Sequence, residues 1–323
     1  MALEIKVLNQ AFGELWTAYN GDSVEIIKNI PDDSIHYSLF SPPFASLFTY
    51  SDSERDMGNC KGNDSFMDHF RFLIKDLYRV LMPGRIITIH CMDILATITK
   101  DSFIGLYDFP GMLIKAFQDE GFIYHGRVTI WKDPLIQAVR TKALSLAHKQ
   151  IIKDSSRCSA GLPDYLIHMR KPGDNPEKIA HPKGFESYIG NMPTPTALKH
   201  KDQRKNKFSH EIWQRYASPV WFDINQTNTL NIIAARDEKD EKHICPLQLE
   251  TIARCLILYT NPDDIVLDPF GGIMSVGYEA VKRKRHFIGI ELKKSYFDQG
   301  IKYLKQIGKE LTFPAQLDLE LIA

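Results

Sequence analysis

Short apolar runs rich in β-branched residues alternate along this chain with segments of helical periodicity, and this alternation constrains the fold more than any other feature. Strands separated by helices in this way form a mostly parallel sheet that helices cover on both faces. We therefore predict an α/β fold. The predicted strands are residues 34–40, 85–90, 122–131, 164–171, 263–268 and 285–291. The predicted helices are residues 23–29, 65–81, 111–120, 247–259, 272–284 and 293–308.

Length and composition limit the class of protein. With 323 residues, the chain exceeds the size at which a single core stops growing, so we expect two domains or one large domain with an insertion. The five cysteines are scattered without a C-x-x-C pair, so neither a disulfide framework nor a metal site is expected, and a reducing cytoplasm fits best. No apolar run reaches the length of a signal peptide core or a membrane span, so no membrane partner is expected.

Residues 132–222 interrupt the alternation of strands and helices. This segment is rich in Pro, Gly and Lys and holds 16 Lys and Arg against 8 Asp and Glu, although the whole chain has zero net charge. A basic, loop-rich insertion of this kind is typical of a surface that contacts a phosphate backbone. A solvated charged loop explains the composition equally well.

The sequence SPPF, residues 41–44, directly follows the first of these predicted strands. Proline lacks the N–H that a sheet needs and restricts the residue before it, so Ser41 ends the strand and a stiff, extended turn follows. The turn holds a hydroxyl group and an aromatic ring at a fixed place. The alternative is a plain strand-ending turn whose aromatic ring packs on the core.

A second motif, DPFGG at residues 268–272, follows the strand that ends at Asp268, and the next strand ends at Glu291. Glycines at a strand-to-helix turn let the backbone approach a ligand, and an acidic residue ending the second strand is placed to accept hydrogen bonds from ribose hydroxyls. No G-x-G-x-x-G motif is present, so the ligand needs a ribose but no pyrophosphate. An ordinary tight turn followed by a surface glutamate is the alternative.

The two motifs in this order resemble the amino-group DNA methyltransferases that use S-adenosylmethionine, in their permuted, so-called beta arrangement. The resemblance implies a Rossmann-like methyltransferase sheet, mostly parallel with one antiparallel hairpin strand, and a loop-rich basic insertion. It divides the chain into a catalytic half (1–131), a DNA target-recognition insertion (132–222) and an S-adenosylmethionine-binding half (223–323). The strand at 164–171 is expected to belong to the core sheet.

The resemblance also implies the residues of the site. The expected catalytic residues are Ser41, Pro42, Pro43 and Phe44. The expected cofactor-binding residues are Asp22, His243, Pro246, Asp268, Pro269, Phe270, Gly271, Gly272 and Glu291. The expected DNA contacts are Lys199, Lys201, Arg204, Lys205 and Lys207.

Two of the cofactor positions depart from the family pattern. The family commonly has His and Pro adjacent, whereas Ile244 and Cys245 separate His243 from Pro246 here. Pro246 is expected in the first turn of the following helix, whose N-terminus suits the carboxylate of a methionine. The alternative for His243 is an ordinary capping residue.

The resemblance implies methyl transfer to the exocyclic amino group of a base that has left the DNA double helix. Ser41 Oγ and the Pro42 carbonyl are expected to accept the two N–H bonds of that amino group, while the base stacks on Phe44. The serine favours N4 of cytosine, and N6 of adenine is the alternative. An RNA methyltransferase, or a DNA-binding protein with a degenerate methylase fold, is less favoured. The expected partner is double-stranded DNA; the chain carries no nuclease or helicase motif, so any cognate restriction endonuclease would be a separate protein, and the sequence leaves open whether one exists.

Overall fold

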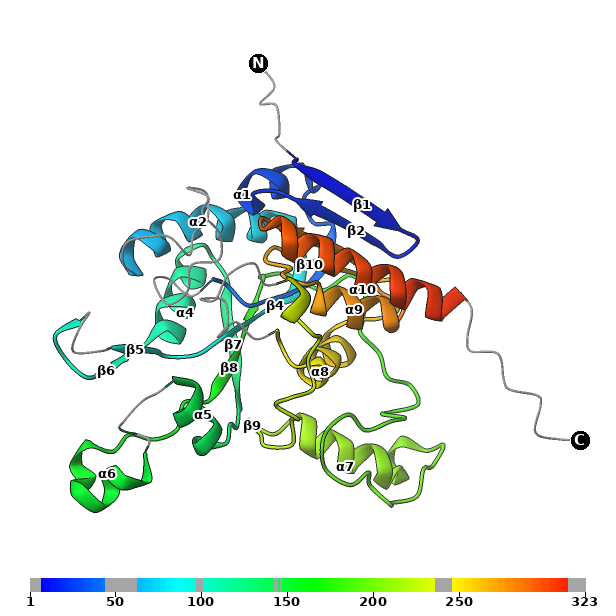
Figure 1. The fold of residues 1–323 in the computed structure, drawn as a ribbon. Helices are drawn as coiled ribbons and strands as arrows, with labels where there is room; N and C mark the ends of the chain where they lie inside the picture. Colours follow the sequence, from blue (N-terminus) through cyan, green and yellow to red (C-terminus); the bar gives the residue numbers. More distant parts are fainter. Residues whose placement is uncertain are drawn as a thin grey trace, which may run out of the picture.

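The computed structural model describes residues 7–43, 63–96, 101–141, 145, 147–235 and 246–312 (Figure 1). A nine-stranded sheet with the order β1-β2-β11-β10-β3-β4-β8-β7-β9 forms its centre. Its strands are β1 (Asn9–Gly13), β2 (Trp16–Asn20), β3 (Ile35–Phe40), β4 (Leu81–Cys91), β7 (Ile123–Ile130), β8 (Asp164–Arg170), β9 (Val220–Trp221), β10 (Ile265–Asp268) and β11 (His286–Glu291). Two short strands, β5 (Ile94–Ala96) and β6 (Gly105–Tyr107), pair separately.

Helices alternate with these strands along most of the described chain. The α-helices are α1 (Ser23–Ile26), α2 (Asn63–Val80), α4 (Phe109–Asp119), α5 (Pro134–Thr141), α6 (His148–Lys153), α7 (Lys207–Tyr216), α8 (Leu249–Tyr259), α9 (Ser275–Lys282) and α10 (Lys294–Thr312). Short 3-10 turns are η1 (Ile27–Asn29), η4 (Ser155–Arg157), η5 (Gln203–Lys205) and η6 (Ile233–Ala235). In this part of the chain, no helix combines the length and the apolar character that crossing a bilayer requires.

The large sheet is mostly parallel, which confirms the predicted fold class. Strands β2, β11, β10, β3 and β4 run parallel to one another, and β7 pairs in parallel with β9. Strand β8 lies between β4 and β7 and is antiparallel to both. The antiparallel hairpin of β1 and β2 at the sheet edge adds a second reversed strand that the sequence analysis did not predict.

Helices cover the faces of the sheet (Figure 1), and a hydrophobic cluster lies beneath each layer of helices. One layer includes α2 and α4, and the other includes α8, α9 and α10. Helix α2 shows why: its buried Phe66, Phe70, Leu73 and Leu77 recur at spacings of three and four residues and therefore share one helical face. Because helices cover both faces, a ligand can reach the sheet only at the loops that follow the strand ends.

Residues 132–222 contribute helices as well as loops, and one of these helices, α7, packs against α8. Phe208, Ile212 and Tyr216 of α7 form a small core of their own. Next to this core, the Arg254 guanidinium of α8 is completely buried and pairs with Asp223. The Arg254 guanidinium also lies over the ring of Tyr216, at 4.9 Å from the ring centroid. The second half of the insertion is therefore packed against α8.

Candidate active site

One edge of the sheet gathers polar side chains from both predicted motifs. The carboxyl ends of β2, β11, β10, β3 and β4 lie along this edge, and so does the end of β7. Because β8 is antiparallel, its first residue reaches the same edge. Neighbouring strands are about 4.8 Å apart, so side chains at consecutive strand ends are close enough to act on one ligand. In sheet order, the residues at this edge are Asn20, Glu291, Asp268, Ser41, His90, Asp164 and Lys132.

The glycine turn after β10 brings the backbone against the end of β11. The N–H of Gly271 donates to the carbonyl of Ile290 at 2.8 Å, and Gly272 has a positive φ of 52°. A Cβ atom at Gly271 would lie 2.6 Å from Sδ of Met274, so no larger residue fits without movement. The predicted need for glycine at this turn therefore has a steric cause.

Glu291 braces this turn. One of its carboxylate oxygens accepts the N–H of Gly272 at 2.7 Å, and the other accepts the N–H of Lys293 at 2.7 Å. A carboxylate oxygen has a second lone pair, so these bonds leave acceptor capacity for ribose hydroxyls. The side chain is half-buried at the sheet edge. The residue predicted to hold the ribose also shapes the loop that would lie beneath the ribose.

Asp268 is buried at the end of β10, where its Oδ1 accepts the N–H of Phe270 at 2.9 Å. Burial raises the pKa of Asp268 to about 8, and the nearby Glu291 carboxylate adds to this effect, while the bond from Phe270 opposes it. The carboxyl group is therefore mostly protonated at neutral pH. A cation placed beside it would favour the charged form, so the site is suited to an ammonium group.

Phe270 and Pro269 of the turn also contact other elements of the protein. The Phe270 ring packs against Phe40 and Phe70, with centroid separations of 5.7 and 6.1 Å. Pro269 is buried, and its carbonyl accepts the hydroxyl of Ser23. These contacts tie the turn to β3, α2 and the start of α1.

The end of β2 completes the cofactor side of the edge. Asp22 is the N-cap of α1 and accepts the N–H of Val24 at 2.9 Å. Asn20 donates its side-chain amide to the carbonyls of Glu291 and Leu292 at 2.8 and 2.9 Å. The sequence analysis singled out Asp22 but missed Asn20, which fixes the Asp22 loop beside the end of β11.

Ser41 lies at the end of β3, next to the strand that ends at Asp268. Pro42 is buried, whereas Ser41 and Pro43 are half-buried; Phe44 and His243 lie outside the described residues. The Ser41 hydroxyl is 2.8 Å from Nδ1 of His90 on β4. The two predicted motifs therefore meet at adjacent strand ends.

Behind Ser41 lies a polar group that the sequence analysis missed. Nε2 of His90 is 3.0 Å from Oδ2 of the buried Asp164, and the Lys132 ammonium pairs with Oδ1 of the same carboxylate. Burial by itself would raise the pKa of Asp164, but His90 and Lys132 outweigh burial and lower the pKa to about 2. The sequence did contain a signal for this group, since a polar residue lies at the end of β4, at the start of β8 and after β7. An antiparallel strand was expected in the sheet, and such a strand brings its first residue to the edge where the parallel strands end.

The start of α8 differs from the prediction for Pro246. Gln248 is the N-cap of this helix, with an extended φ of −62° and ψ of 131°, and the helix begins at Leu249. Pro246 thus precedes the cap, and its predicted place in the first turn is wrong. Gln248 is buried, and its Oε1 has no hydrogen-bond partner among the described residues.

All five predicted DNA contacts have exposed side chains on the segment that leads into α7. Two of them have local partners: Lys199 donates to the carbonyl of Glu186 at 3.0 Å, and Arg204 pairs with Asp202 at 3.3 Å. Asn206 caps α7 by accepting the N–H of Ser209. The basic segment is thus presented on an ordered, capped scaffold.

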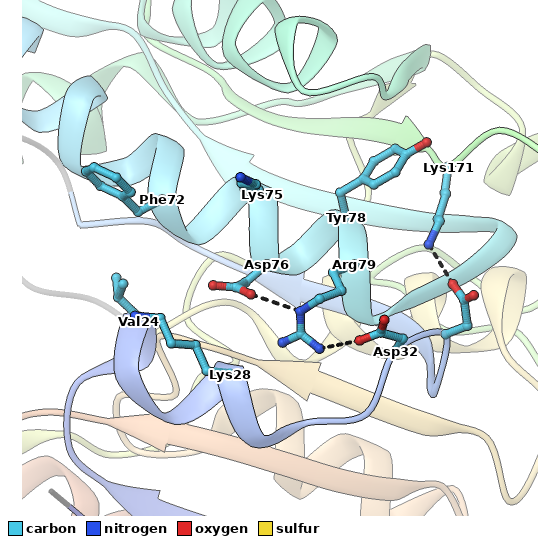
Figure 2. Close-up of a pocket in the computed structure, with 10 residues that line it drawn as sticks. Val24, Lys28, Asp32, Phe72, Lys75, Asp76, Tyr78, Arg79 and Lys171 are labelled. Atoms are coloured by element: carbon cyan, nitrogen blue, oxygen red, sulfur yellow. Dashed lines mark hydrogen bonds and ion pairs between the residues drawn. The ribbon is translucent and has the colours of Figure 1, made fainter. Parts of the chain in front are cut away.

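A pocket of about 660 Å³ lies between α1, η1 and α2 (Figure 2). None of the residues that line it belongs to the set gathered at the carboxyl edge of the sheet. Arg79 donates to the carboxylates of Asp32 and Asp76 at 2.6 and 3.0 Å, and Lys171 donates to Asp33 at 2.6 Å. Arg79 also donates to two backbone carbonyls, one at the start of η1 and one at its C-cap. These charges stabilise the packing of η1 on α2 and are already paired with one another.

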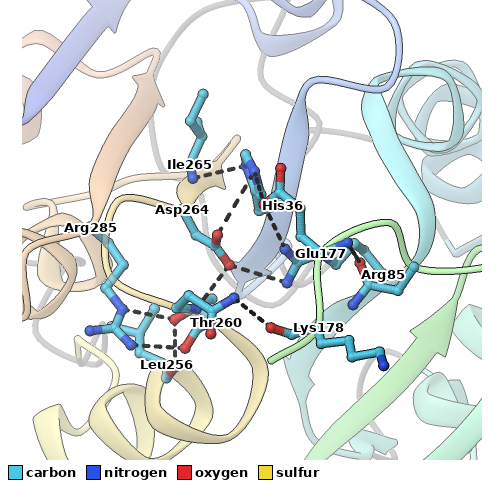
Figure 3. Close-up of polar contacts among 11 residues, drawn as sticks. His36, Arg85, Glu177, Lys178, Leu256, Thr260, Asp264, Ile265 and Arg285 are labelled. Carbon is cyan, nitrogen blue, oxygen red and sulfur yellow. Dashed lines mark hydrogen bonds and ion pairs between the residues drawn. The ribbon is translucent and has the colours of Figure 1, made fainter. Parts of the chain in front are cut away.

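At the opposite edge of the sheet, His36, Glu177 and Asp264 come together with the spacing of a metal site (Figure 3). The completely buried guanidinium of Arg85 lies 3.1 Å from Asp264 and 3.6 Å from Glu177, so it already supplies the positive charge. Nδ1 of His36 accepts the N–H of Ile265 at 3.1 Å. The network fastens the insertion to the amino ends of β3, β4 and β10.

Comparisons with known proteins identify the family to which the chain is similar. A family model described as DNA methylase, of the N6/N4 type, matches residues 35–302. The type II methyltransferase M.Cfr9I of Citrobacter freundii is 36% identical over 312 residues, which cover 90% of this chain and 87% of that protein. The DNA adenine methyltransferase YhdJ of Escherichia coli is 32% identical over 305 residues, covering 90% and 83% of the two chains.

A solved structure has the same fold. The DNA modification methylase TTHA0409 of Thermus thermophilus, complexed with S-adenosyl-L-methionine, superposes with a TM-score of 0.59 at 18% identity. The superposition covers 89% of this chain and 94% of that one.

Proposed function

Because this chain belongs to the N6/N4 DNA methylase family, we propose that Ser41 and the turn around it carry out the reaction, on N4 of an extruded cytosine. As a member of this family, the protein transfers a methyl group from S-adenosylmethionine to an exocyclic amino group in DNA. The observation that carries the proposal is the adjacency of the two motifs: Ser41 ends β3, and Asp268 ends the neighbouring β10.

In this proposal, the cofactor lies over the ends of β2, β11 and β10. Glu291 binds the ribose hydroxyls, and Asp22 contacts the adenine from the next strand end. Asp268 faces the ammonium group of the methionine moiety, which is consistent with a carboxyl group whose pKa rises to about 8 without such a cation. Gly271 and Gly272 allow close approach of the cofactor, and the start of α8 near Pro246 takes its carboxylate.

The target base enters the edge beside Ser41. An exocyclic amino group is a poor nucleophile because its lone pair is delocalised into the ring. Hydrogen bonds from that group to Ser41 Oγ and the Pro42 carbonyl favour a pyramidal nitrogen whose lone pair points at the methyl group. The turn is held in place by Pro43 and by the buried Pro42, so the acceptors are positioned before the base arrives.

Cytosine is favoured over adenine by Ser41, because the family usually has aspartate at this position for adenine N6. Adenine N6 is the second candidate, since a relative 32% identical to this chain is named as a DNA adenine methyltransferase. Nucleoside mass spectrometry of DNA from cells that express the protein distinguishes the two. We expect N4-methylcytosine, absent from cells that express Ser41→Ala; N6-methyladenine instead would reverse the assignment.

Duplex DNA is bound across the insertion at 132–222, which lies between a catalytic half at 1–131 and a cofactor-binding half at 223–323. The exposed side chains of the basic segment from Lys199 to Lys207 are suited to phosphate contacts. A separate restriction endonuclease is the proposed partner, and methylation by this protein would protect DNA from cleavage by that enzyme. Digestion of DNA from expressing cells with a panel of type II endonucleases identifies the methylated sequence, because methylation blocks cleavage at that site. The endonuclease whose cleavage is blocked has the specificity that a cognate partner would have.

A further inference from the structure

Three side chains from three strands form a continuous polar path that leads from the catalytic turn into the sheet. The path runs from the Ser41 hydroxyl to Nδ1 of His90 at 2.8 Å, and from Nε2 of His90 to Oδ2 of Asp164 at 3.0 Å. The side chain of Asp164 is 2% exposed and that of His90 is 12% exposed. Among the described residues neither Nε2 nor Oδ2 has an aligned hydrogen-bond partner, and the 3.0 Å contact between them is the polar contact that each of these two atoms makes.

The carboxylate beside Nε2 favours one tautomer of His90. A neutral imidazole has one N–H, and the nitrogen that faces a carboxylate is the one that holds the proton. Nε2 of His90 faces Asp164, so Nδ1 accepts the proton of the Ser41 hydroxyl. The hydroxyl hydrogen is then directed away from the incoming base, and both lone pairs of Ser41 Oγ remain for the amino group.

We propose that His90, held by Asp164, receives the proton that methyl transfer releases, through the hydroxyl of Ser41. This proposal rests on the function proposed above, in which Ser41 is the group that contacts the target nitrogen. His90 does not touch the base, so it is a positioning and relay residue.

The step balances as follows. The lone pair of the amino nitrogen forms the bond to the methyl carbon, and the carbon–sulfur bond breaks with its electron pair returning to sulfur. The nitrogen is then positively charged and carries one proton too many. That proton passes to Ser41 Oγ as the Ser41 proton passes to Nδ1 of His90. The neutral methylated base and an imidazolium remain, and the imidazolium later returns its proton to water.

The surroundings of Asp164 suit this role. Its pKa of about 2 keeps it ionised, so it can stabilise the imidazolium by direct contact. The Lys132 ammonium, which pairs with the other carboxylate oxygen, keeps Asp164 compensated when His90 is neutral.

Three variants separate a relay from a purely structural contact. His90→Asn retains a side-chain oxygen close to the position of Nδ1, so it can still accept the Ser41 hydroxyl, but it cannot take up a proton. His90→Ala removes both functions, and Ser41→Ala tests the catalytic turn itself. His125→Asn is the matched control, because His125 is exposed on β7, away from the carboxyl edge.

The measurements are single-turnover methylation of duplex DNA that lacks the modification, and calorimetric binding of S-adenosylmethionine. A relay predicts that His90→Asn and His90→Ala are both slowed about 100-fold, with cofactor affinity unchanged. A contact that only orients Ser41 predicts that His90→Asn stays within about twofold of wild type while His90→Ala is slow, and this result would overturn the relay.

The same data keep the two proposals apart. If Ser41→Ala is slow but His90→Asn is not, the relay fails and the assignment of Ser41 stands. If Ser41→Ala reacts at the wild-type rate, the proposed function of the turn fails, whatever His90 does.

Discussion

Arg254 and Asp223 face each other as a two-point ion pair, with Nη1 of Arg254 at 2.8 Å from Oδ1 of Asp223 and Nη2 at 2.6 Å from Oδ2. The Arg254 Nε also donates to the carbonyl of Ile189, and Tyr188 donates its hydroxyl to Asp223. The pair therefore joins α8 to the chain on both sides of the segment that carries the basic residues. Its burial makes the consequences of breaking it predictable.

Arg254→Met should destabilise the protein by about 3–5 kcal/mol, because it leaves the buried Asp223 carboxylate without its cation. Urea unfolding followed by circular dichroism measures this free energy. The double variant Arg254→Met/Asp223→Leu should recover much of the loss, since no buried charge remains. A single variant as stable as wild type would show that Asp223 is solvated and that the anchor contributes little.

Cofactor binding should release protons through Asp268. The pKa of this carboxyl group is raised to about 8 in the cofactor-free protein, so the group is mostly protonated at pH 7. An ammonium group beside it lowers that pKa, so the affinity for S-adenosylmethionine should rise as pH increases towards 8.

Calorimetry at pH 7 in two buffers of different ionisation enthalpy counts the released protons. Asp268→Asn is the control, because it keeps the shape of the side chain and has no proton to release. Equal proton counts for the wild type and this variant would remove Asp268 from the ammonium site.

Glu291→Gln should be nearly as harmful as Glu291→Ala, although glutamine is similar in size. Both carboxylate oxygens accept backbone N–H groups, from Gly272 and from Lys293, and the amide nitrogen of glutamine would face one of these donors. We expect each variant to weaken S-adenosylmethionine binding by about 1.5–3 kcal/mol, measured by calorimetry. Wild-type affinity in the glutamine variant would mean that only one carboxylate oxygen matters.

Neutralising Lys199, Lys201, Arg204, Lys205 and Lys207 together should weaken DNA binding and flatten its salt dependence. Each phosphate contact contributes about 0.9 to the slope of log affinity against log salt, because it releases condensed counterions. Fluorescence anisotropy with a labelled duplex at several salt concentrations gives this slope. The exposed Lys302, Lys305 and Lys309 of α10 supply a control set outside the insertion. An unchanged slope in the five-residue variant would identify the basic segment as solvated surface.

The parts of the site that local sequence encodes were predictable, and those that long-range pairing creates were not. The turn at 268–272 needs its glycines for steric reasons that act within a few residues, so the motif could be found by inspection. The contact between His90 and Asp164 exists only because β8 enters the sheet between β4 and β7 in the reverse direction. Neither segment alone encodes that neighbour, and the polar residues at the strand ends indicate it only once the direction of β8 is known.

Two errors have equally specific causes. Strand β1 was missed because its residues are mostly exposed, so it lacks the alternation of apolar and polar residues that reveals a half-buried strand. Pro246 was placed inside α8 because proline favours the first turn of a helix, whereas the extended backbone of Gln248 delays the helix to Leu249. In both cases the tertiary context overrode a local preference.

The position of β8 sets a limit on how such proteins can exchange specificity. A recombination event that transplanted residues 132–222 as one block would replace Lys132 and Asp164, and with them the polar group behind Ser41. An exchange that keeps both residues has to begin after Lys132, cut the chain on both sides of β8 and transfer two separate loops. Chimaeras built with four junctions should therefore keep their activity more often than chimaeras built with two.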